Sequence, residues 1–140
     1  MRFVVIGAGM AGVLSAIKLQ DAGFTDVTVY EKADSIGGTW RENTYPGVAC
    51  DVPSHLYSYS FAPNADWSQV FSPGPEIRGS IEAVAERHGI TGKFRFGTEV
   101  VRLEFIGGRW KVATAGGDED EADVVIAATG ALHHPSYPDI

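Results

Sequence analysis

The pattern of apolar positions predicts a strand, a helix and a second strand at the start of the chain. Residues 3–6 are a short, β-rich apolar run of the kind that forms a buried parallel strand. Across residues 10–22 apolar side chains recur at helical spacing, and Gly23 follows as a helix stop. Residues 27–30 form a second buried run. We therefore expect a strand–helix–strand unit with the right-handed crossover that parallel strands adopt.

The later part of the chain predicts a second helix and a β-hairpin. Residues 76–88 place apolar side chains on one helical face, and Gly89 ends that pattern. Two apolar runs, 100–106 and 109–115, flank Gly107-Gly108, which is a strong hairpin signal. The acidic run at 118–121 follows two further glycines, and we interpret it as a solvated turn.

Two remaining strands complete an α/β fold. Alternation at 94–96 indicates a short strand, and the strongly apolar run at 123–128 indicates a longer one. We expect a Rossmann-like, doubly wound parallel sheet in the order 94–96, 27–31, 2–6, 123–128, with a β-hairpin or meander inserted. The last strand then leaves an open sheet edge, where a homodimer can form.

Composition narrows the class of partner and the compartment. The chain has 140 residues, enough to bury one core, and a formal net charge of −7. An acidic chain without a basic patch argues against nucleic acid and acidic membrane surfaces, and no apolar stretch is long enough to span a bilayer. The single cysteine, Cys50, excludes a disulfide framework and favours a reducing, cytoplasmic location. No metal site is predicted, since the histidines lack further ligands at metal spacing.

A glycine-rich loop lies between the first predicted strand and helix. Its G-x-G-x-x-G residues are Gly7, Ala8, Gly9, Met10, Ala11 and Gly12. In dinucleotide-binding folds the first glycine allows a tight turn, the second lets the backbone approach a pyrophosphate, and the third lets helix and strand pack closely. Glu31 ends the next strand, where a carboxylate can accept hydrogen bonds from a ribose diol. The alternatives are a glycine-rich turn without a ligand and a plain surface carboxylate.

Three further motifs carry a resemblance to a known family. They are Gly37-Gly38-Thr39-Trp40, then Tyr45-Pro46-Gly47-x-x-Cys50-Asp51, and finally Ala128-Thr129-Gly130 with Leu132, Pro135 and Pro138. With the glycine loop and Glu31, this order resembles the two-dinucleotide-binding flavoproteins. Within them it is most similar to class B flavin-dependent monooxygenases, in particular the Baeyer–Villiger branch. The resemblance covers essentially the whole chain.

The resemblance implies a cofactor, a reaction and a division of the protein. Residues 1–140 would be the first segment of a split FAD-binding domain, without the NADPH domain and without the segment that completes the flavin site. The parent protein would use FAD, NADPH and oxygen to insert oxygen into ketones or to oxidise sulfur or nitrogen in small molecules. NADPH would be bound mainly by parts outside this chain, and we expect no turnover by the chain alone.

The resemblance also implies roles for individual residues. The glycine loop would hold the pyrophosphate, and Glu31 would bind the adenosine ribose. Lys32, the next residue, is also expected to contact the cofactor. Asp51 would lie beside the isoalloxazine ring in a supporting catalytic role. The remaining expected cofactor contacts are Gly38, Thr39, Trp40, Val52, Tyr57, Val100, Ala128, Thr129 and Gly130.

Residues 38–61 support this interpretation in part. The stretch is apolar and aromatic yet mostly aperiodic, so it needs something to cover. A planar tricyclic ring needs aromatic walls, and Trp40, Tyr45 and Tyr57 are suitable. For Tyr59 and Phe61 we favour packing in the core. For Asp51, the residues alone weigh evenly between a flavin contact and a turn residue.

Two other readings stay open. The chain could be a non-catalytic FAD- or NAD-binding module or a truncated remnant. The Baeyer–Villiger fingerprint F-x-G-x-x-x-H does not occur in these residues, so ketone and heteroatom oxidation are not distinguished. A disulfide reductase is excluded, because it needs a redox pair of cysteines.

Overall fold

The computed structural model describes residues 1–132 and 136–140. Its central element is a parallel sheet with the order β3-β2-β1-β7, which is the predicted order. These strands are β1 (Phe3–Ile6), β2 (Val27–Tyr30), β3 (Phe94–Arg95) and β7 (Val124–Ala127). Pro135, expected in the last family motif, and His133-His134 lie outside the described residues.

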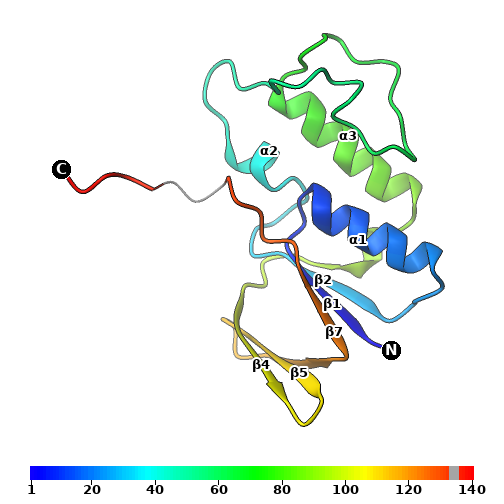
Figure 1. Ribbon diagram of the computed structural model, residues 1–140, viewed down its shortest axis with the longest axis vertical. Helices are drawn as coiled ribbons and strands as arrows, with labels where there is room; N and C mark the ends of the chain where they lie inside the picture. Colours follow the sequence, from blue (N-terminus) through cyan, green and yellow to red (C-terminus); the bar gives the residue numbers. More distant parts are fainter. Residues whose placement is uncertain (133–135) are drawn as a thin grey trace.

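Helices α1 (Met10–Asp21) and α3 (Gly74–Arg87) lie together on one face of the sheet (Figure 1). The helix α1 agrees with its prediction, whereas α3 begins at Gly74 rather than at residue 76. Its earlier start has a local cause, because Pro75 lies in the first turn, where the missing N–H has no intrahelical acceptor. A short 3₁₀ turn, η1 (Thr91–Lys93), connects α3 to β3.

Apolar side chains from both helices and from the sheet form the main core. Burial removes these side chains from water, which is the dominant stabilising term in folding. The core includes Val5, Val13, Ile17, Val29, Ile77, Ile81, Val84 and Ile90, all at most 2% exposed.

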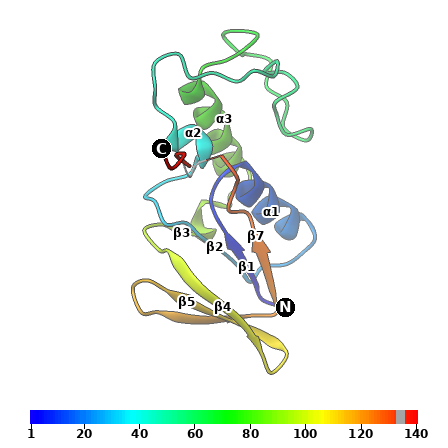
Figure 2. The ribbon, with the colours of Figure 1, turned by 60° about the vertical axis from the view of Figure 1, so that its left-hand side comes forward.

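An antiparallel meander covers the opposite face of the sheet (Figures 1 and 2). Its strands are β4 (Val100–Ile106), β5 (Arg109–Thr114) and β6 (Glu119–Ala122), in that order. A second apolar cluster joins the two sheets, with Val4 of β1, Val112 of β5 and Ala122 of β6 fully buried. The molecule therefore has three layers: helices, parallel sheet and meander.

The prediction for the acidic run at 118–121 is wrong. Residues from Glu119 onward form β6, an edge strand of the meander, rather than a solvated turn. Alternation explains the error, because a strand that covers a sheet on one side exposes every second residue. Glu119 and Glu121 are exposed, while Asp120 points inward and pairs with the guanidinium of Arg2.

Arg2 and Asp120 connect the meander to the parallel sheet. Arg2 also donates from Nη1 to Asp26 Oδ1 (2.6 Å) and from Nη2 to Thr28 Oγ1 (3.2 Å). Asp120 Oδ2 accepts the hydroxyl of Tyr30 at 2.9 Å. Partial burial by itself raises the pKa of the Asp120 carboxyl, but the hydrogen bonds from Arg2 and Tyr30 outweigh it and hold that pKa below its usual value.

Asp120→Asn should therefore destabilise the chain in a pH-dependent way. A carboxyl with a depressed folded-state pKa stabilises the fold above its unfolded pKa of about 3.9, and that contribution is lost as pH falls through the folded value. At pH 7 we expect a loss of about 1.5 kcal/mol, as for hydrogen bonds to a charged group, and this loss should begin to shrink as pH falls below about 4. Urea titrations at several pH values measure it, with Glu119→Gln as the matched exposed control. A pH-independent difference would contradict this account.

Between β2 and α3 the chain is largely irregular. One short helix, α2 (Thr39–Glu42), interrupts it, and an isolated bridge joins Ala49 to Pro73. Tyr59 is buried in the core as predicted, and its hydroxyl donates to the Met10 carbonyl at 2.7 Å. Burial raises the pKa of the Tyr59 phenol. Phe61 is half-buried and stacks on Tyr59, so both aromatics pack as predicted.

In the described part of the chain, none of the helices has the length and apolarity that crossing a bilayer requires. Along these same residues, β7 is the last strand of the parallel sheet, as the sequence predicts.

Candidate functional site

A cleft of about 660 Å³ lies at the carboxyl ends of β1, β2 and β7. Ligands of open α/β sheets bind at this end, because the loops that follow the strands diverge there. The volume is within the range of small-molecule and cofactor sites. Its walls come from the glycine loop, the loop between β2 and α2, the segment after β7 and the start of β4.

The floor of the cleft is built from backbone that approaches backbone. Gly7 has a φ of 104°, and a β-carbon there would lie 2.4 Å from the carbonyl oxygen of Ala128. Gly38 has a φ of 54°, and its β-carbon would lie 2.9 Å from the α-carbon of Gly9. The Gly37 N–H also donates to the Ala8 carbonyl at 3.0 Å. Three segments distant in sequence therefore meet where side chains have no room.

Gly12 has a packing role rather than a place in the cleft wall. A β-carbon there would lie 1.8 Å from the Gly7 carbonyl oxygen. Only a glycine lets α1 pack this tightly onto the loop that precedes it. The first turn of α1 consequently faces the cleft through Met10 and Ala11, with N–H groups that find no acceptor inside a helix. Such a helix end favours an anion.

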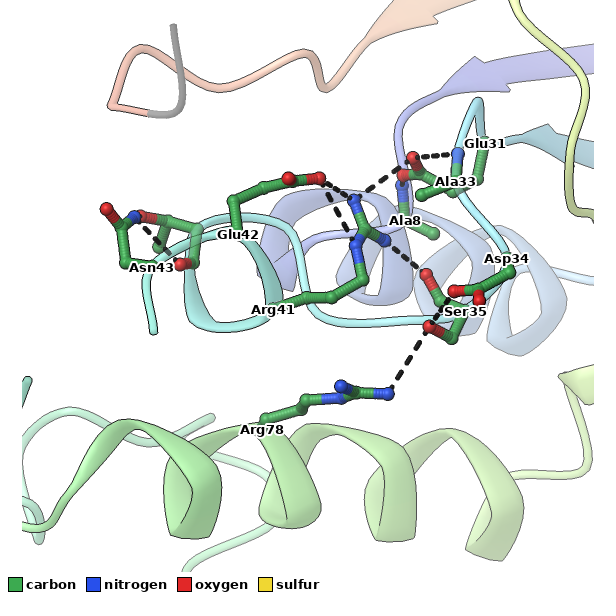
Figure 3. Close-up of polar contacts among 10 residues, drawn as sticks. Ala8, Glu31, Ala33, Asp34, Ser35, Arg41, Glu42, Asn43 and Arg78 are labelled. Atoms are coloured by element: carbon green, nitrogen blue, oxygen red, sulfur yellow. Dashed lines mark hydrogen bonds and ion pairs between the residues drawn. The ribbon is translucent and has the colours of Figure 1, made fainter. Parts of the chain in front are cut away.

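Glu31 lies in the cleft wall with a buried carboxylate, 7% exposed (Figure 3). Its Oε2 accepts the Ala8 N–H at 2.7 Å, and its Oε1 accepts the Ala33 N–H at 2.9 Å. The guanidinium of Arg41 lies 3.3 Å from Oε1. The carboxylate is therefore attached directly to the glycine loop, and its orientation is fixed.

An aromatic pair forms another wall of the cleft. Trp40 and Tyr57 meet edge to face with ring centroids 5.6 Å apart, and the indole N–H donates to the Tyr57 hydroxyl at 3.2 Å. Both residues line the cleft. The rings are nearly perpendicular, at 81°, so the pair contributes apolar aromatic surface of two orientations together with a polar contact, as cofactor sites commonly do. Tyr45, expected beside them, is 61% exposed and lies outside the cleft lining.

Most of the predicted cofactor contacts come together in this cleft. Those that line it are Gly7, Gly9, Met10, Ala11, Glu31, Lys32, Gly38, Thr39, Trp40, Tyr57, Val100, Ala128, Thr129 and Gly130. Four predicted residues do not line it. Ala8 and Gly12 belong to the glycine loop but are buried and do not reach the cleft, while Asp51 and Val52 are exposed in the irregular segment. The role of Asp51 beside a flavin ring stays a prediction.

The cleft also contains residues that were not among the predicted cofactor contacts. Gly37 and Leu132 belong to the family motifs, whereas the others were not singled out: Ile6, Tyr30, Arg41, Thr98, Glu99, Ala127 and Ala131. For Ile6, Tyr30 and Ala127 a signal existed, because each ends a strand of the parallel sheet. Arg41 had no such signal, since neither a period nor a motif relates it to Glu31.

Comparisons with known proteins agree with this geometry. The family model described as NAD(P)-binding Rossmann-like domain matches residues 5–73. An uncharacterised monooxygenase of Mycobacterium tuberculosis is 55% identical over 136 residues, covering 97% of this chain and 28% of that protein. A Baeyer-Villiger monooxygenase of Streptomyces coelicolor is 49% identical over 142 residues, covering 100% of this chain and 27% of that protein.

A solved structure extends the similarity to three dimensions. The crystal structure of OTEMO in complex with FAD and NADP has a TM-score of 0.92 and 31% identity, covering 100% of this chain and 27% of that chain. The predicted Rossmann-like fold and the resemblance to flavin-dependent monooxygenases are both confirmed. The chain spans about a quarter of the length of the curated relatives that it matches.

Proposed function

We propose that residues 1–140 are the FAD-binding portion of a flavin-dependent monooxygenase. The observation that carries this proposal is the junction in which Gly9 meets Gly38 and Gly7 meets Ala128 beside the buried carboxylate of Glu31. A pyrophosphate needs bare backbone and a helix N-terminus, and a ribose diol needs a fixed acceptor. Both lie in one cleft of this chain.

The residues of the cleft fit FAD from one end to the other. Glu31 would accept the hydroxyls of the adenosine ribose, and Val100 would border the adenine. The glycine loop would hold the pyrophosphate, with Ala128, Thr129 and Gly130 approaching from the neighbouring strand. Trp40 and Tyr57 would shield the flavin side from water. FAD, once bound, supplies the electron transfer and the activation of oxygen.

The reaction of the whole protein is proposed from its relatives. A relative named as a Baeyer-Villiger monooxygenase supports insertion of oxygen into ketones, with oxidation of sulfur or nitrogen in small molecules as the second candidate. NADPH would be bound mainly by residues outside this chain, because its residues contain one G-x-G-x-x-G loop. We therefore propose that residues 1–140 are one segment of a split FAD-binding domain.

A non-catalytic nucleotide-binding module is the alternative. The glycine loop and Glu31 serve NAD as well as FAD. The Trp40–Tyr57 pair favours FAD, because it adds apolar aromatic surface to the cleft, which suits the large flavin ring system.

Titration of the purified chain with FAD, followed by flavin fluorescence, tests the proposal. We expect saturable binding, and Gly9→Asp should weaken it about 100-fold, or 2.8 kcal/mol. The new carboxylate would lie where the pyrophosphate approaches, next to Gly38. Gly79→Asp is the matched control, since Gly79 lies exposed in α3 with no atom within 4 Å of its β-carbon position.

Two outcomes separate the proposed FAD site from the alternative. Equal FAD affinity of the Gly9→Asp variant and the unmodified chain would contradict the proposed site. Competition by NAD at an affinity equal to that of FAD would favour the nucleotide-binding module. Sedimentation of the same sample reports whether the chain forms a homodimer, which we predict through the edge of β7.

A further inference from the structure

Arg41 lies at the centre of a polar cluster beside the glycine loop (Figure 3). Its side chain is 10% exposed, which is low for an arginine that borders a cleft. The guanidinium donates from Nη2 to Glu31 Oε1 (3.3 Å) and to Glu42 Oε1 (2.6 Å), and from Nη1 to the carbonyl of Ser35. One planar group thus connects the end of β2, the loop that follows it and the helix α2.

Glu31 receives its donors from three directions. The Ala8 N–H comes from the glycine loop, the Ala33 N–H from the loop after β2, and the third donor is Arg41. A carboxylate has about four lone-pair positions, so part of its accepting capacity remains for a ligand. Oε1 already accepts two of these bonds and Oε2 accepts one, so the position left for a ligand is on Oε2.

Arg41 also holds the segment that carries the second glycine pair. Its bond to the Ser35 carbonyl spans the loop of residues 31–38. A β-carbon at Gly37 would lie 2.8 Å from the Arg41 β-carbon, so the helix α2 packs directly on this loop. Gly38 follows at once and meets Gly9. The ribose side and the pyrophosphate side of the cleft are therefore joined through one arginine.

Charge gives Arg41 a second effect on the same ligand. A pyrophosphate is anionic, and it would lie in the cleft that contains the buried carboxylate of Glu31. Buried charges are screened weakly, so an uncompensated carboxylate there would oppose the ligand. The guanidinium, which it shares with the more exposed carboxylate of Glu42, offsets part of that charge and leaves an accepting position of Glu31 open.

We propose that Arg41 is a positioning residue for the adenosine end of the cofactor: it orients the carboxylate of Glu31 and holds the 31–38 loop against the glycine loop. This inference rests on the proposed function, in which the cleft binds FAD. Lysine cannot replace arginine here, because a single ammonium group lacks the planar fork that reaches Glu31, Glu42 and the Ser35 carbonyl together.

The test measures dissociation constants of FAD and of ADP for a set of variants of the 140-residue chain. ADP contains the adenosine ribose and the pyrophosphate without the flavin. We expect Arg41→Gln to raise both constants about tenfold. Arg41→Lys should raise both at least about threefold. In the Glu31→Gln background, Arg41→Gln should add about threefold rather than about tenfold, because the carboxylate it orients has gone and its bond to the Ser35 carbonyl remains to be lost. Arg87→Gln, an exposed arginine in the last turn of α3, is the matched control.

Each possible result either supports the positioning role of Arg41 or overturns it. Unchanged FAD and ADP affinity in Arg41→Gln, or a full effect in the Glu31→Gln background, overturns the role of Arg41 and leaves the proposed function intact. A change for FAD alone overturns it too, since Arg41 would then act on the flavin end. Failure of the unmodified chain to bind FAD overturns the proposed function itself, and this inference with it. Circular dichroism reports folding, and if Arg41→Gln does not fold, Arg41→Lys decides by the same criteria.

Discussion

Replacing Gly12 with alanine should abolish FAD binding and lower the free energy of unfolding by about 3 kcal/mol or more. A single added methyl group rarely has such an effect, and here the reason is geometric. The new β-carbon would lie 1.8 Å from the carbonyl oxygen of Gly7 and 2.9 Å from its carbonyl carbon. Both neighbours are backbone atoms, so no side chain can turn away. The helix α1 would have to move off the loop that forms the floor of the cleft.

Urea denaturation followed by circular dichroism and FAD titration measure the two effects separately. Gly79→Ala is the matched control in helix α3, where the β-carbon would meet open space. That change should stabilise the chain by about 1 kcal/mol, because alanine loses less backbone freedom than glycine in a helix. A Gly12→Ala variant that unfolds at the same urea concentration as the unmodified chain would contradict the close packing described for this loop.

Glu31→Ala should destabilise the chain by about 3 kcal/mol even without a ligand. The substitution leaves the buried Ala8 N–H without its acceptor and removes one of the two carboxylates that the Arg41 guanidinium contacts. The loss therefore has a structural part that precedes any loss of FAD affinity. The free energy of unfolding in the absence of FAD isolates this part.

Two variants give the comparison for Glu31. Glu86→Ala removes an exposed carboxylate from α3 and should change stability by less than about 0.5 kcal/mol. Glu31→Gln keeps one oxygen for the Ala8 N–H but presents an amide to the other donors, so an intermediate loss is expected. If the ligand-free Glu31→Ala chain is as stable as the unmodified one, Glu31 has no structural role.

The sequence predicted the strand order because each element is marked locally. Two short apolar runs identify β1 and β2, and the stretch of helical periodicity between them, which ends at a glycine, identifies α1. The right-handed crossover rule for parallel strands then predicts how these strands lie in the sheet. The acidic residues from Glu119 to Glu121 misled the prediction for a physical reason. Charge normally indicates solvent, but a strand at the edge of a meander alternates, and Asp120 is directed inward by a partner near the other end of the chain, Arg2.

In the candidate site, too, local features of the sequence could be predicted and contacts between distant side chains could not. Backbone requirements leave glycines in the sequence, so Gly7, Gly9 and Gly38 could be assigned a role before the structure was known. Contacts between side chains that are brought together by folding have no comparable signal in the sequence. Arg41 reaches Glu31 because the 31–38 loop folds back. The Gly37-Gly38 pair indicates that turn, but no feature of the sequence shows which side chain then meets Glu31. Asp51 shows the opposite case, since its motif suggested a ligand contact and the structure leaves it exposed outside the cleft lining.

The pairing of β1 with β7, more than a hundred residues later in the sequence, has a consequence for the order in which the site can be assembled. Strand β1 pairs in register with β7, Phe3 with Val124 and Ile6 with Ala127, and the Gly7 turn is closed by Ala128. Closing so long a loop is entropically slow and happens late in folding. On a ribosome that adds about 5–20 residues per second, the glycine loop exists for several seconds without the strand that completes it. Nucleotide capture by the cleft is therefore expected only after β7 has been synthesised and has paired with β1.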